Sequence, residues 1–452
     1  MGDSTKRSEG LSVVTTITFA VGTMVGAGVF VLSGLVINSA GPGAIISYIA
    51  CAILVSFSGL SYAVLASIFP EDGGGYLYTE KTLGKYPGFL SGWIMYIAQP
   101  IVLAFVLLSF GVYLNLLLSI AIDPRIFAAI ALLLITVLNL RGIAEAGKFE
   151  VIIVVVKVSL LVVFFLFGIF YFQPTAFSPL LPNGVGGVVN GIAMVFFAYM
   201  GFQVITMMGG EVKQSSKSVP IAMLVSILVV ALVYVGVIIA LLVANLPSYG
   251  SQSVFDAAVI LMGPIGGAVI AFTAVLSTLS SANALTAGAS RIVMEMASER
   301  QIPGRLATLR YGQPSNAILL GSAVALTFIL FGSFEAILNM VNVAMLIAMV
   351  FVNVGAIVLI RNDNLPDSKK HFRIPFGILF PLIGAATCII ISLSISLISI
   401  IIGIFLLFIG SIFYFVEDTP EGRKERIKIA RELKRTELIQ KLEEEYEELR
   451  ED

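Results

Sequence analysis

Long runs of hydrophobic residues, separated by short polar segments, repeat along most of this chain. A helix needs about 20 apolar residues to cross the hydrocarbon core of a membrane. By this measure the hydropathy pattern divides the chain into twelve expected spans: 11–37, 41–69, 87–118, 125–141, 149–172, 187–210, 219–245, 263–294, 315–331, 335–360, 376–395 and 397–416. The pattern predicts an all-α polytopic membrane protein with twelve transmembrane helices, and the lipid bilayer is its first expected partner.

The basic residues predict how these spans are oriented. With both termini on the inner side, all but two of the 27 lysine and arginine residues fall in inner segments, the exceptions being Arg125 and Lys157. Because positive charge accumulates in cytoplasmic loops, we expect a multi-pass protein of the cell (plasma) membrane with both termini in the cytoplasm. Residues 1–10 then form a short cytoplasmic segment, and they lead into the first span without a recognisable cleavage site for a signal peptide.

The composition narrows the classes of function. Of 452 residues, 58% are hydrophobic and 12% charged, and the formal net charge of −1 suggests no nucleic-acid partner. Cys51 and Cys388 both lie inside apolar runs, where a disulfide is not expected. We find no metal-ligand spacing and no nucleophile and base pair at membrane depth, and His371 lies in an expected cytoplasmic loop. The sequence therefore predicts neither an enzyme nor a protein with a cofactor or a metal.

The last segment, 417–452, differs from the rest because it is rich in Glu, Lys and Arg, with apolar residues at mixed helical spacing. This pattern predicts a charged cytoplasmic tail that forms a solvated or surface-lying helix. A helix that docks on a partner protein is the alternative interpretation.

One lysine lies inside a span. Lys157 follows Glu150 by about 10 Å along the axis of the fifth expected helix, which is a marginal distance for its side chain to reach the headgroups. An ionisable group inside a membrane is costly and commonly marks a functional site. A lysine that snorkels or that binds a neighbouring helix is the alternative.

Two expected spans contain features that favour a break in the helix. Gly22, Gly26 and Gly28 lie within seven residues of the first span, and Gly201 lies among bulky aromatic residues in the sixth. Interrupted helices at corresponding positions of two halves of a transporter indicate its central binding site. Close packing of helices is the alternative for the glycines, and lipid-facing or core packing is the alternative for the aromatic residues.

If the two breaks meet near the middle of the bilayer, they offer two opposite poles. The half-helix that begins after Gly26 presents free amides and a positive dipole end, which suit a carboxylate. Freed carbonyls around Phe197, Ala198 and Met200, with Met24 opposite them, suit an ammonium group. The pattern therefore predicts a zwitterionic ligand.

Several motifs together resemble the amino acid, polyamine and organocation transporter family. They are Gly26-Ala-Gly-Val-Phe30, Pro70–Tyr78, Phe196–Phe202 with Gly210–Lys213 and Val219-Pro220, Ser290-Arg291 followed by Ile302-Pro303, and Lys157. The resemblance implies an inverted five-plus-five (LeuT-like) repeat with helices 1 and 6 broken. The first repeat is 11–172, the second is 187–360, and the two extra helices lie in 376–416. It also implies transport of amino acids by alternating access.

The resemblance implies roles for individual residues of the substrate site. Ala27 and Gly28 match amide donors to the substrate carboxylate, Met24, Phe197 and Met200 match carbonyl acceptors, and the Phe197 ring matches an aromatic gate. Gln203 stands where many members carry Glu or Asp, which puts in doubt a gating step that needs a carboxylate. The expected substrate site comprises Met24, Gly26, Ala27, Gly28, Gln99, Phe197, Ala198, Met200, Gly201 and Gln203.

Lys157 falls where proton-coupled members carry a lysine, so the resemblance implies coupling to a proton. The expected neighbours of its ammonium group are Gly22, Thr23, Ser280 and Ser281. Ordinary hydrogen bonding between helices is the alternative for the two serines.

The side chain of the substrate is predicted to be neutral, because no acidic residue lies deep in any expected span. The acidic residues near spans, all at their ends, are Glu145, Glu150, Glu211, Glu295 and Glu335. Gln99, Asn339 and Asn342 are candidates to contact the side chain, or else to bind neighbouring helices. We therefore expect proton symport of a neutral amino acid. An exchanger, a polyamine transporter, and a ligand-binding sensor or channel are the alternatives.

Overall fold

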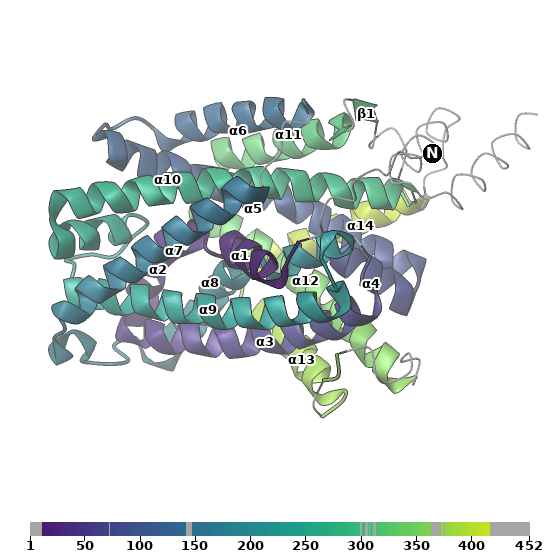
Figure 1. Ribbon diagram of the computed structural model, residues 1–452, viewed down its shortest axis with the longest axis horizontal. Coiled ribbons are helices and arrows are strands. Elements are labelled where there is room, and N and C mark those ends of the chain that lie inside the picture. The colour runs from purple at the N-terminus through teal and green to yellow at the C-terminus, as the bar shows by residue number, and fades with distance from the viewer. Residues whose placement is uncertain are drawn as a thin grey trace, which may run out of the picture.

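The protein is a bundle of helices in which the long members run in roughly the same direction (Figure 1). A computed structural model describes residues 11–71, 73–141, 147–298, 301–302, 306, 308–310, 313–362, 372–374 and 376–415. The expected cytoplasmic segments 1–10 and 417–452, and His371 in its loop, lie outside these residues, so what was predicted for them stays a prediction.

Helices make up almost all of the regular structure. The α-helices are α1 Val13–Met24, α2 Ala27–Ala40, α3 Ala44–Ile68, α4 Gly74–Leu83, α5 Lys85–Leu118, α6 Pro124–Leu140, α7 Gly147–Phe170, α8 Gly184–Tyr199, α9 Ser215–Ala244, α10 Ser253–Ser298, α11 Ser315–Phe331, α12 Phe334–Arg361, α13 Leu379–Leu393 and α14 Leu397–Phe415. The 3-10 helices are η1 Gly41–Gly43, η2 Pro174–Phe177 and η3 Phe202–Glu211, and the short strands β1 Leu309–Arg310 and β2 Gln313–Pro314 pair antiparallel.

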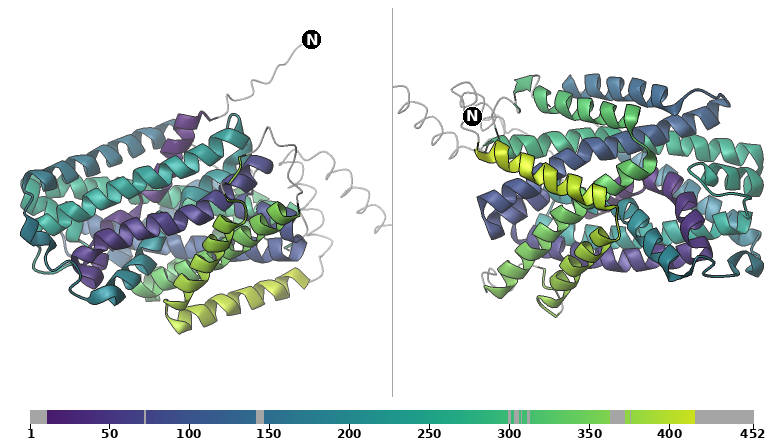
Figure 2. Two further views of the ribbon diagram at one scale, coloured as in Figure 1. Left: turned by 90° about the horizontal axis from the view of Figure 1, so that it is seen from below. Right: turned by 180° about the vertical axis from the view of Figure 1, so that it is seen from behind.

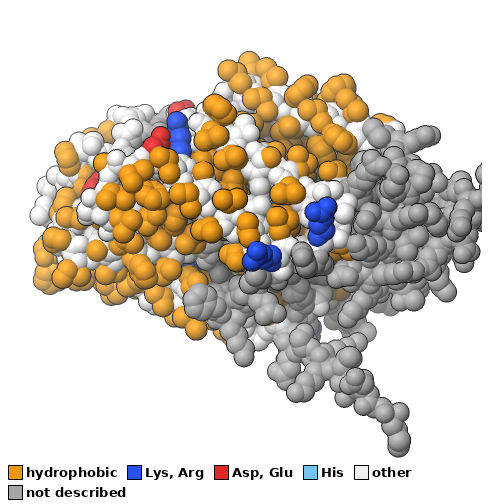
Figure 3. All heavy atoms as spheres, turned by 90° about the horizontal axis from the view of Figure 1, so that it is seen from above, with side chains coloured by type: hydrophobic (Ala, Val, Ile, Leu, Met, Phe, Trp, Pro, Cys, Tyr) orange, Lys and Arg blue, Asp and Glu red, His pale blue; other side chains and the backbone are white. Residues whose placement is uncertain are grey.

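The surface is that of a membrane protein. In the described part of the chain, eight helical stretches are long and apolar enough to cross a bilayer, and α1, α6, α11 and α13 are shorter apolar helices. Large hydrophobic side chains such as Leu133, Phe170 and Phe331 are exposed, and hydrophobic groups cover much of the face in Figure 3. Surfaces of this kind need lipid around them. The protein is therefore a polytopic helical membrane protein, while the count of twelve spans stays a prediction.

The broken helices lie in the middle of the bundle. Helices α2 and α8 pack on each other, with the α3 and α9 pair on one side and the α5 and α10 pair on the other (Figures 1 and 2). Helix α7 packs on α1, α9 and α10. This arrangement surrounds the backbone of the breaks with other helices, as non-helical backbone at membrane depth requires.

Both predicted interruptions are present. Helix α1 ends at Met24 and α2 begins at Ala27, with Gly26 in a non-helical conformation between them (φ −110°, ψ −141°). Helix α8 ends at Tyr199, and Gly201, at φ +123°, turns the chain into the 3-10 helix η3. A φ in this range favours glycine because the residue lacks a Cβ atom.

Two elements differ from the hydropathy pattern. Helix α4 was not expected, because it has only ten residues and mixed polarity. Helix α10 begins ten residues before the expected start at 263, and Gly263, at φ +77° and followed by Pro264, bends it at that point. The hydropathy pattern placed the start of this helix at 263, where the structure has the bend.

Candidate functional site

A cavity lies where the two helix breaks face α5, α10 and α12. All ten residues expected at the substrate site line it, as do Thr23 and Ser281, whereas Asn339 and Asn342 do not. The remaining wall is mostly apolar and was not predicted: Val102, Val106, Val204, Met207, Ala284, Leu285, Gly288 and Met345.

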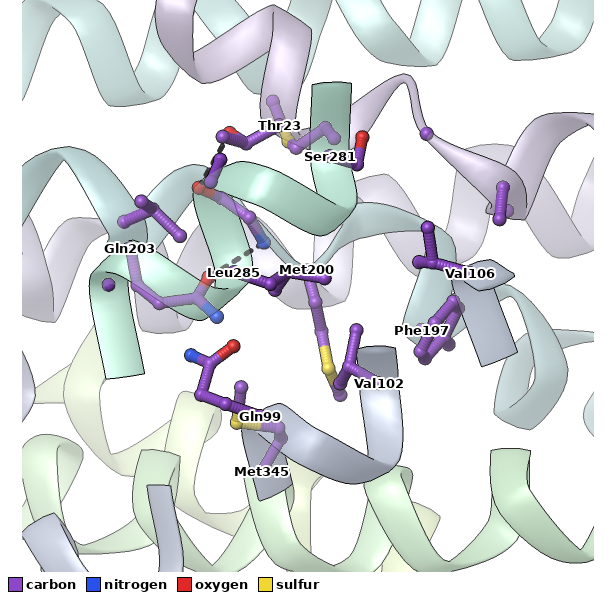
Figure 4. A pocket seen from close by; sticks show the side chains of 18 of the residues that line it. Thr23, Gln99, Val102, Val106, Phe197, Met200, Gln203, Ser281, Leu285 and Met345 are labelled. Carbon is purple, nitrogen blue, oxygen red and sulfur yellow. Dashed lines mark hydrogen bonds between the residues drawn. The ribbon is translucent and has the colours of Figure 1, made fainter. Parts of the chain in front are cut away.

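The two breaks are in direct contact. The hydroxyl of Thr23 lies 3.1 Å from the carbonyl oxygen of Gly201 (Figure 4), and it shares its one proton between this oxygen and that of Ala20, 2.9 Å away in its own helix. A Cβ atom on Gly201 would lie 3.0 Å from the backbone nitrogen of Met24 and from the backbone carbonyl carbon of Thr23. Glycine is therefore required at this position both by its positive φ and by the close approach of the α1 backbone.

The amino-terminal end of α2 faces the cavity. Ala27 and Gly28 are its first two residues, and the first amides of a helix have no carbonyl partner within that helix. A Cβ atom on Gly28 would lie 3.0 Å from the Cα atom of Ala198, so glycine also allows α2 to approach α8. Free amides at the positive end of a helix dipole attract an anion such as a carboxylate.

Tyr234 on α9 binds the carbonyls of both breaks and was not predicted. Its hydroxyl lies 2.7 Å from the carbonyl oxygen of Met24 and 2.9 Å from that of Ala198. The Met24 oxygen also accepts the amide of Gly26 at 2.8 Å, so two hydrogen-bond donors already face its two lone pairs. Because Tyr234 is a buried tyrosine in a long apolar run, its need for a hydroxyl partner was the available signal.

The expected carbonyl acceptors are therefore not equivalent. The oxygen of Phe197 accepts a hydrogen bond from the amide of Met200 at 3.1 Å, and among the described residues the oxygen of Ala198 has only the Tyr234 hydroxyl, whose one proton it shares with Met24. Each keeps one lone pair for another donor. In this arrangement Phe197 and Ala198 are better placed than Met24 to accept a hydrogen bond from an ammonium group.

Phe197 lies at one end of the cavity. Its side chain is buried, and its ring centroid lies 4.6 Å from that of Phe105 on α5. Figure 4 places it beside Val106 and away from Gln99 and Gln203. The ring thus forms an apolar wall that has an aromatic partner on the neighbouring helix.

Lys157 on α7 forms a hydrogen bond with the backbone at the first helix break. Its side chain is 1% exposed, and its Nζ atom donates to the carbonyl oxygen of Gly22 at 2.7 Å. In a continuous helix this oxygen would accept the amide of Gly26, but that amide binds Met24 instead. The break therefore frees the carbonyl that the lysine uses.

A serine one helical turn from the predicted pair also binds the break. Ser277 on α10 donates to the carbonyl oxygen of Val25 at 2.8 Å. Ser281 instead lines the cavity, and its buried Oγ has no hydrogen-bond partner among the described residues. Ser280 is half-buried on the same helix. Its expected contact with Lys157, like that of Thr23, stays a prediction.

The cavity is electrically neutral. None of the described residues that line it carries a charge, and its polar side chains are Thr23, Gln99, Gln203 and Ser281. Among the described residues, no group of three or more His, Cys, Asp or Glu lies together where it would hold a metal. The chemistry available is therefore hydrogen bonding by backbone groups, amides and hydroxyls.

Comparison with known proteins gives a consistent set of relatives. The family model described as "Amino acid permease" matches residues 11–421. The chain is 28% identical to the methylthioribose transporter of Bacillus subtilis and 28% identical to its branched-chain amino acid permease BcaP, covering in each case 88% of this chain and 90% of the relative. It is 25% identical to the serine/threonine exchanger SteT of the same organism, over 82% of this chain and 87% of the relative.

Proposed function

The chain belongs to the amino acid permease family, whose members are transporters and not enzymes, and we propose that it takes up a neutral amino acid by proton symport. Amino acid transport is what its permease relatives support. The neutral substrate and the proton are our proposal, and so are the residues that bind them.

The observation that carries the proposal is the pairing of opposite backbone poles in one cavity. The free amides of Ala27 and Gly28 donate hydrogen bonds to the carboxylate of the amino acid, and the carbonyls of Phe197 and Ala198, with that of Met200, accept hydrogen bonds from its ammonium group. The two breaks lie in contact through Thr23 and Gly201, so both poles are within reach of one small zwitterion.

The neutral lining supports a neutral side chain. A cationic or anionic side chain would be buried without an opposite charge among the described lining residues, which is costly in a membrane protein. A polyamine, which carries no carboxylate, would leave the amides of α2 without an anion. The lining therefore favours a neutral amino acid over a polyamine.

The proton is assigned to Lys157. Its buried ammonium group donates a hydrogen bond to the carbonyl oxygen of Gly22, five residues before α2 begins at Ala27. We propose that the protonated lysine stabilises one arrangement of α1 against α7. Loss of its proton to the cytoplasm weakens this contact, α1 moves, and the substrate is released inward. This is alternating access with α1 as the moving element.

The positions of the two helix breaks support the proposed repeat of five plus five helices. The first break lies in the first helix of segment 11–172, and the second lies in the first helix of segment 187–360. In an inverted five-plus-five arrangement of these segments, with 376–416 outside it, the two breaks meet and one half can move against the other.

Uptake into liposomes tests the proposal. The purified protein should be screened by thermal shift against the common amino acids and methylthioribose, because a ligand present at about 100 times its Kd stabilises by about 2.7 kcal/mol. The best ligand is then supplied, radiolabelled, to proteoliposomes with an acidic outside and no internal amino acid. We expect accumulation that a proton carrier abolishes.

Other outcomes identify the alternatives. Uptake only after preloading with an amino acid means exchange, and this result would contradict symport. Binding without uptake in either format means a sensor. Flux that never exceeds equilibrium under any gradient means a channel. Stabilisation by methylthioribose but by no amino acid would refute an amino acid as the substrate.

A further inference from the structure

Two glutamine side chains occupy one end of the central cavity. Gln99 on α5 is 3% exposed and Gln203 on η3 is 2% exposed, and both line the cavity. Figure 4 shows their amide groups pointing toward one another from opposite walls, away from Phe197 and Val106. This end of the cavity therefore presents two amides, whereas the opposite end is apolar.

The orientation of the Gln203 amide is fixed by its neighbour. Its Oε1 atom accepts the backbone amide of Gly201 at 2.9 Å, so the other end of the group is the NH₂ donor. Within the part of the chain that the structure describes, this nitrogen donates no hydrogen bond. Gln203 thus supports the helix break with its oxygen and keeps two N–H donors for a ligand.

The amide of Gln99 is unpartnered. Its Oε1 atom is buried and has no hydrogen-bond partner among the described residues. A buried polar group without a partner is unfavourable, and such groups are rare in folded proteins. An amide that is unpaired and faces a ligand cavity is therefore expected to gain its partner from the ligand.

The position of the amides relative to the proposed poles assigns their target. This step rests on the proposed function, in which the substrate's carboxylate and ammonium groups bind at Ala27, Gly28, Phe197 and Ala198. The rest of the substrate then extends toward the part of the cavity that Gln99 and Gln203 line. The two amides therefore face the substrate's side chain.

We propose that Gln99 and Gln203 select a neutral amino acid whose side chain carries a hydroxyl or carboxamide group. Such a side chain accepts from the NH₂ group of Gln203 and donates to the oxygen of Gln99. An aliphatic side chain leaves the NH₂ group of Gln203 and the oxygen of Gln99 unpaired and desolvated, and a site built to bind a polar group discriminates strongly against a ligand that lacks it.

A second cavity adjoins the first, and the side chain of Gln99 between them limits the length of the substrate's side chain. It lies between α5, α10 and α11, and Gln99 and Leu285 line both cavities. Gln99 therefore forms part of the wall between them. Gln99→Ala should remove this wall and extend the range of bound substrates to longer side chains.

Threonine and valine provide the test, because they have nearly the same shape and differ by one hydroxyl. Their affinities should be measured on the purified full-length protein by competition against a bound amino acid or by ligand titration in thermal shift. We expect wild type to bind threonine about tenfold or more tightly than valine. Gln99→Leu should reduce this preference to about twofold or less.

Asn342→Leu is the matched control. Asn342 is also a buried amide on a core helix, and its Oδ1 atom also lacks a partner among the described residues, but it lines neither cavity. This variant should keep the preference for threonine, even if its stability falls. Gln99→Asn, which retains an amide, should keep part of it.

The outcomes separate this inference from the proposed function. Equal or tighter binding of valine by the wild-type protein would overturn the proposed role of the amide pair while leaving amino acid transport in place. This measurement does not depend on the folding of any variant. A loss of preference in Asn342→Leu equal to that in Gln99→Leu would also overturn it. Failure of every amino acid to bind would refute the proposed function itself.

Discussion

The Nζ atom of Lys157 lies 2.7 Å from the carbonyl oxygen of Gly22, a backbone group that is available only because the first helix breaks four residues later. The amide of Gly26, which would bind this oxygen in a continuous helix, turns to Met24. The cation of α7 and the break in α1 therefore depend on each other. A change in the charge of the lysine acts directly on the helix whose end binds the substrate.

Lys157→Ala should uncouple uptake from the proton gradient. Without the ammonium group α1 loses a contact that depends on protonation, whereas the amides of Ala27 and Gly28 remain in place. In proteoliposomes with an acidic outside, the variant should bind substrate but fail to accumulate it. Lys217→Ala, which removes an exposed lysine of α9, is the control and should accumulate like wild type. Full accumulation by Lys157→Ala would contradict the coupling role.

Tyr234→Phe should weaken both the fold and the substrate site. The change leaves the carbonyls of Met24 and Ala198 without their hydroxyl donor, and we expect a loss of about 1–2 kcal/mol in the free energy of unfolding. Substrate affinity should fall as well, because these carbonyls belong to the two breaks. Thermal unfolding and ligand titration measure the two effects.

Tyr113→Phe is the matched control for that change. The Tyr113 hydroxyl also lies near two carbonyls, those of Phe30 within α2 at 2.8 Å and of Ser251 at 3.4 Å, and neither residue lines the cavity. It should lose comparable stability and keep its substrate affinity. If both variants lose affinity equally, Tyr234 has no special part in the site.

Gly201→Ala should destabilise the second break. Its φ of +123° is unfavourable for alanine, and the new Cβ atom would lie 3.0 Å from the α1 backbone. We expect a loss of about 1–3 kcal/mol in stability together with loss of transport. Gly186→Ala in α8 has open space around it and should be neutral or slightly stabilising. Similar thermal stability of the two variants would argue against a required glycine at 201.

Ser277→Ala should lower stability, whereas Ser281→Ala should lower substrate affinity, although the two serines lie one helical turn apart. Ser277 donates to the carbonyl of Val25, so its loss should lower stability by about 0.5–1.5 kcal/mol. Ser281 has no partner to lose among the described residues, so its loss should leave stability nearly unchanged. Because its hydroxyl faces the cavity, substrate affinity should fall by about three- to tenfold. Unchanged affinity in Ser281→Ala would exclude a substrate contact.

Much of the architecture could be predicted because the signals are local. A run of apolar residues is enough to predict a membrane helix, and Gly26 and Gly201 lie where the helices break. The bend at Gly263 has a local cause too, but hydropathy reads it as a helix end. The short helix Gly74–Leu83 was missed because its residues lack a clear apolar pattern.

The polar contacts of the site were only partly predictable. Lys157 was conspicuous because its charge lies in an apolar run, whereas Tyr234 and Ser277 resemble ordinary helix residues in the sequence. Their partners, Met24, Ala198 and Val25, belong to the two broken segments and lie up to 252 residues away in the chain. Gln99 was a candidate, but its missing partner is visible only when the surrounding helices are in place.

The sequence by itself determined that this is a helical membrane protein, where two of its helices come apart, and that one lysine lies among apolar residues. The tertiary structure decided which side chains meet the backbone groups that the breaks release, and which amides remain for a ligand. The reason is physical. Breaking a helix depends on the conformational freedom of a few neighbouring residues, whereas satisfying its freed carbonyls depends on how distant helices pack.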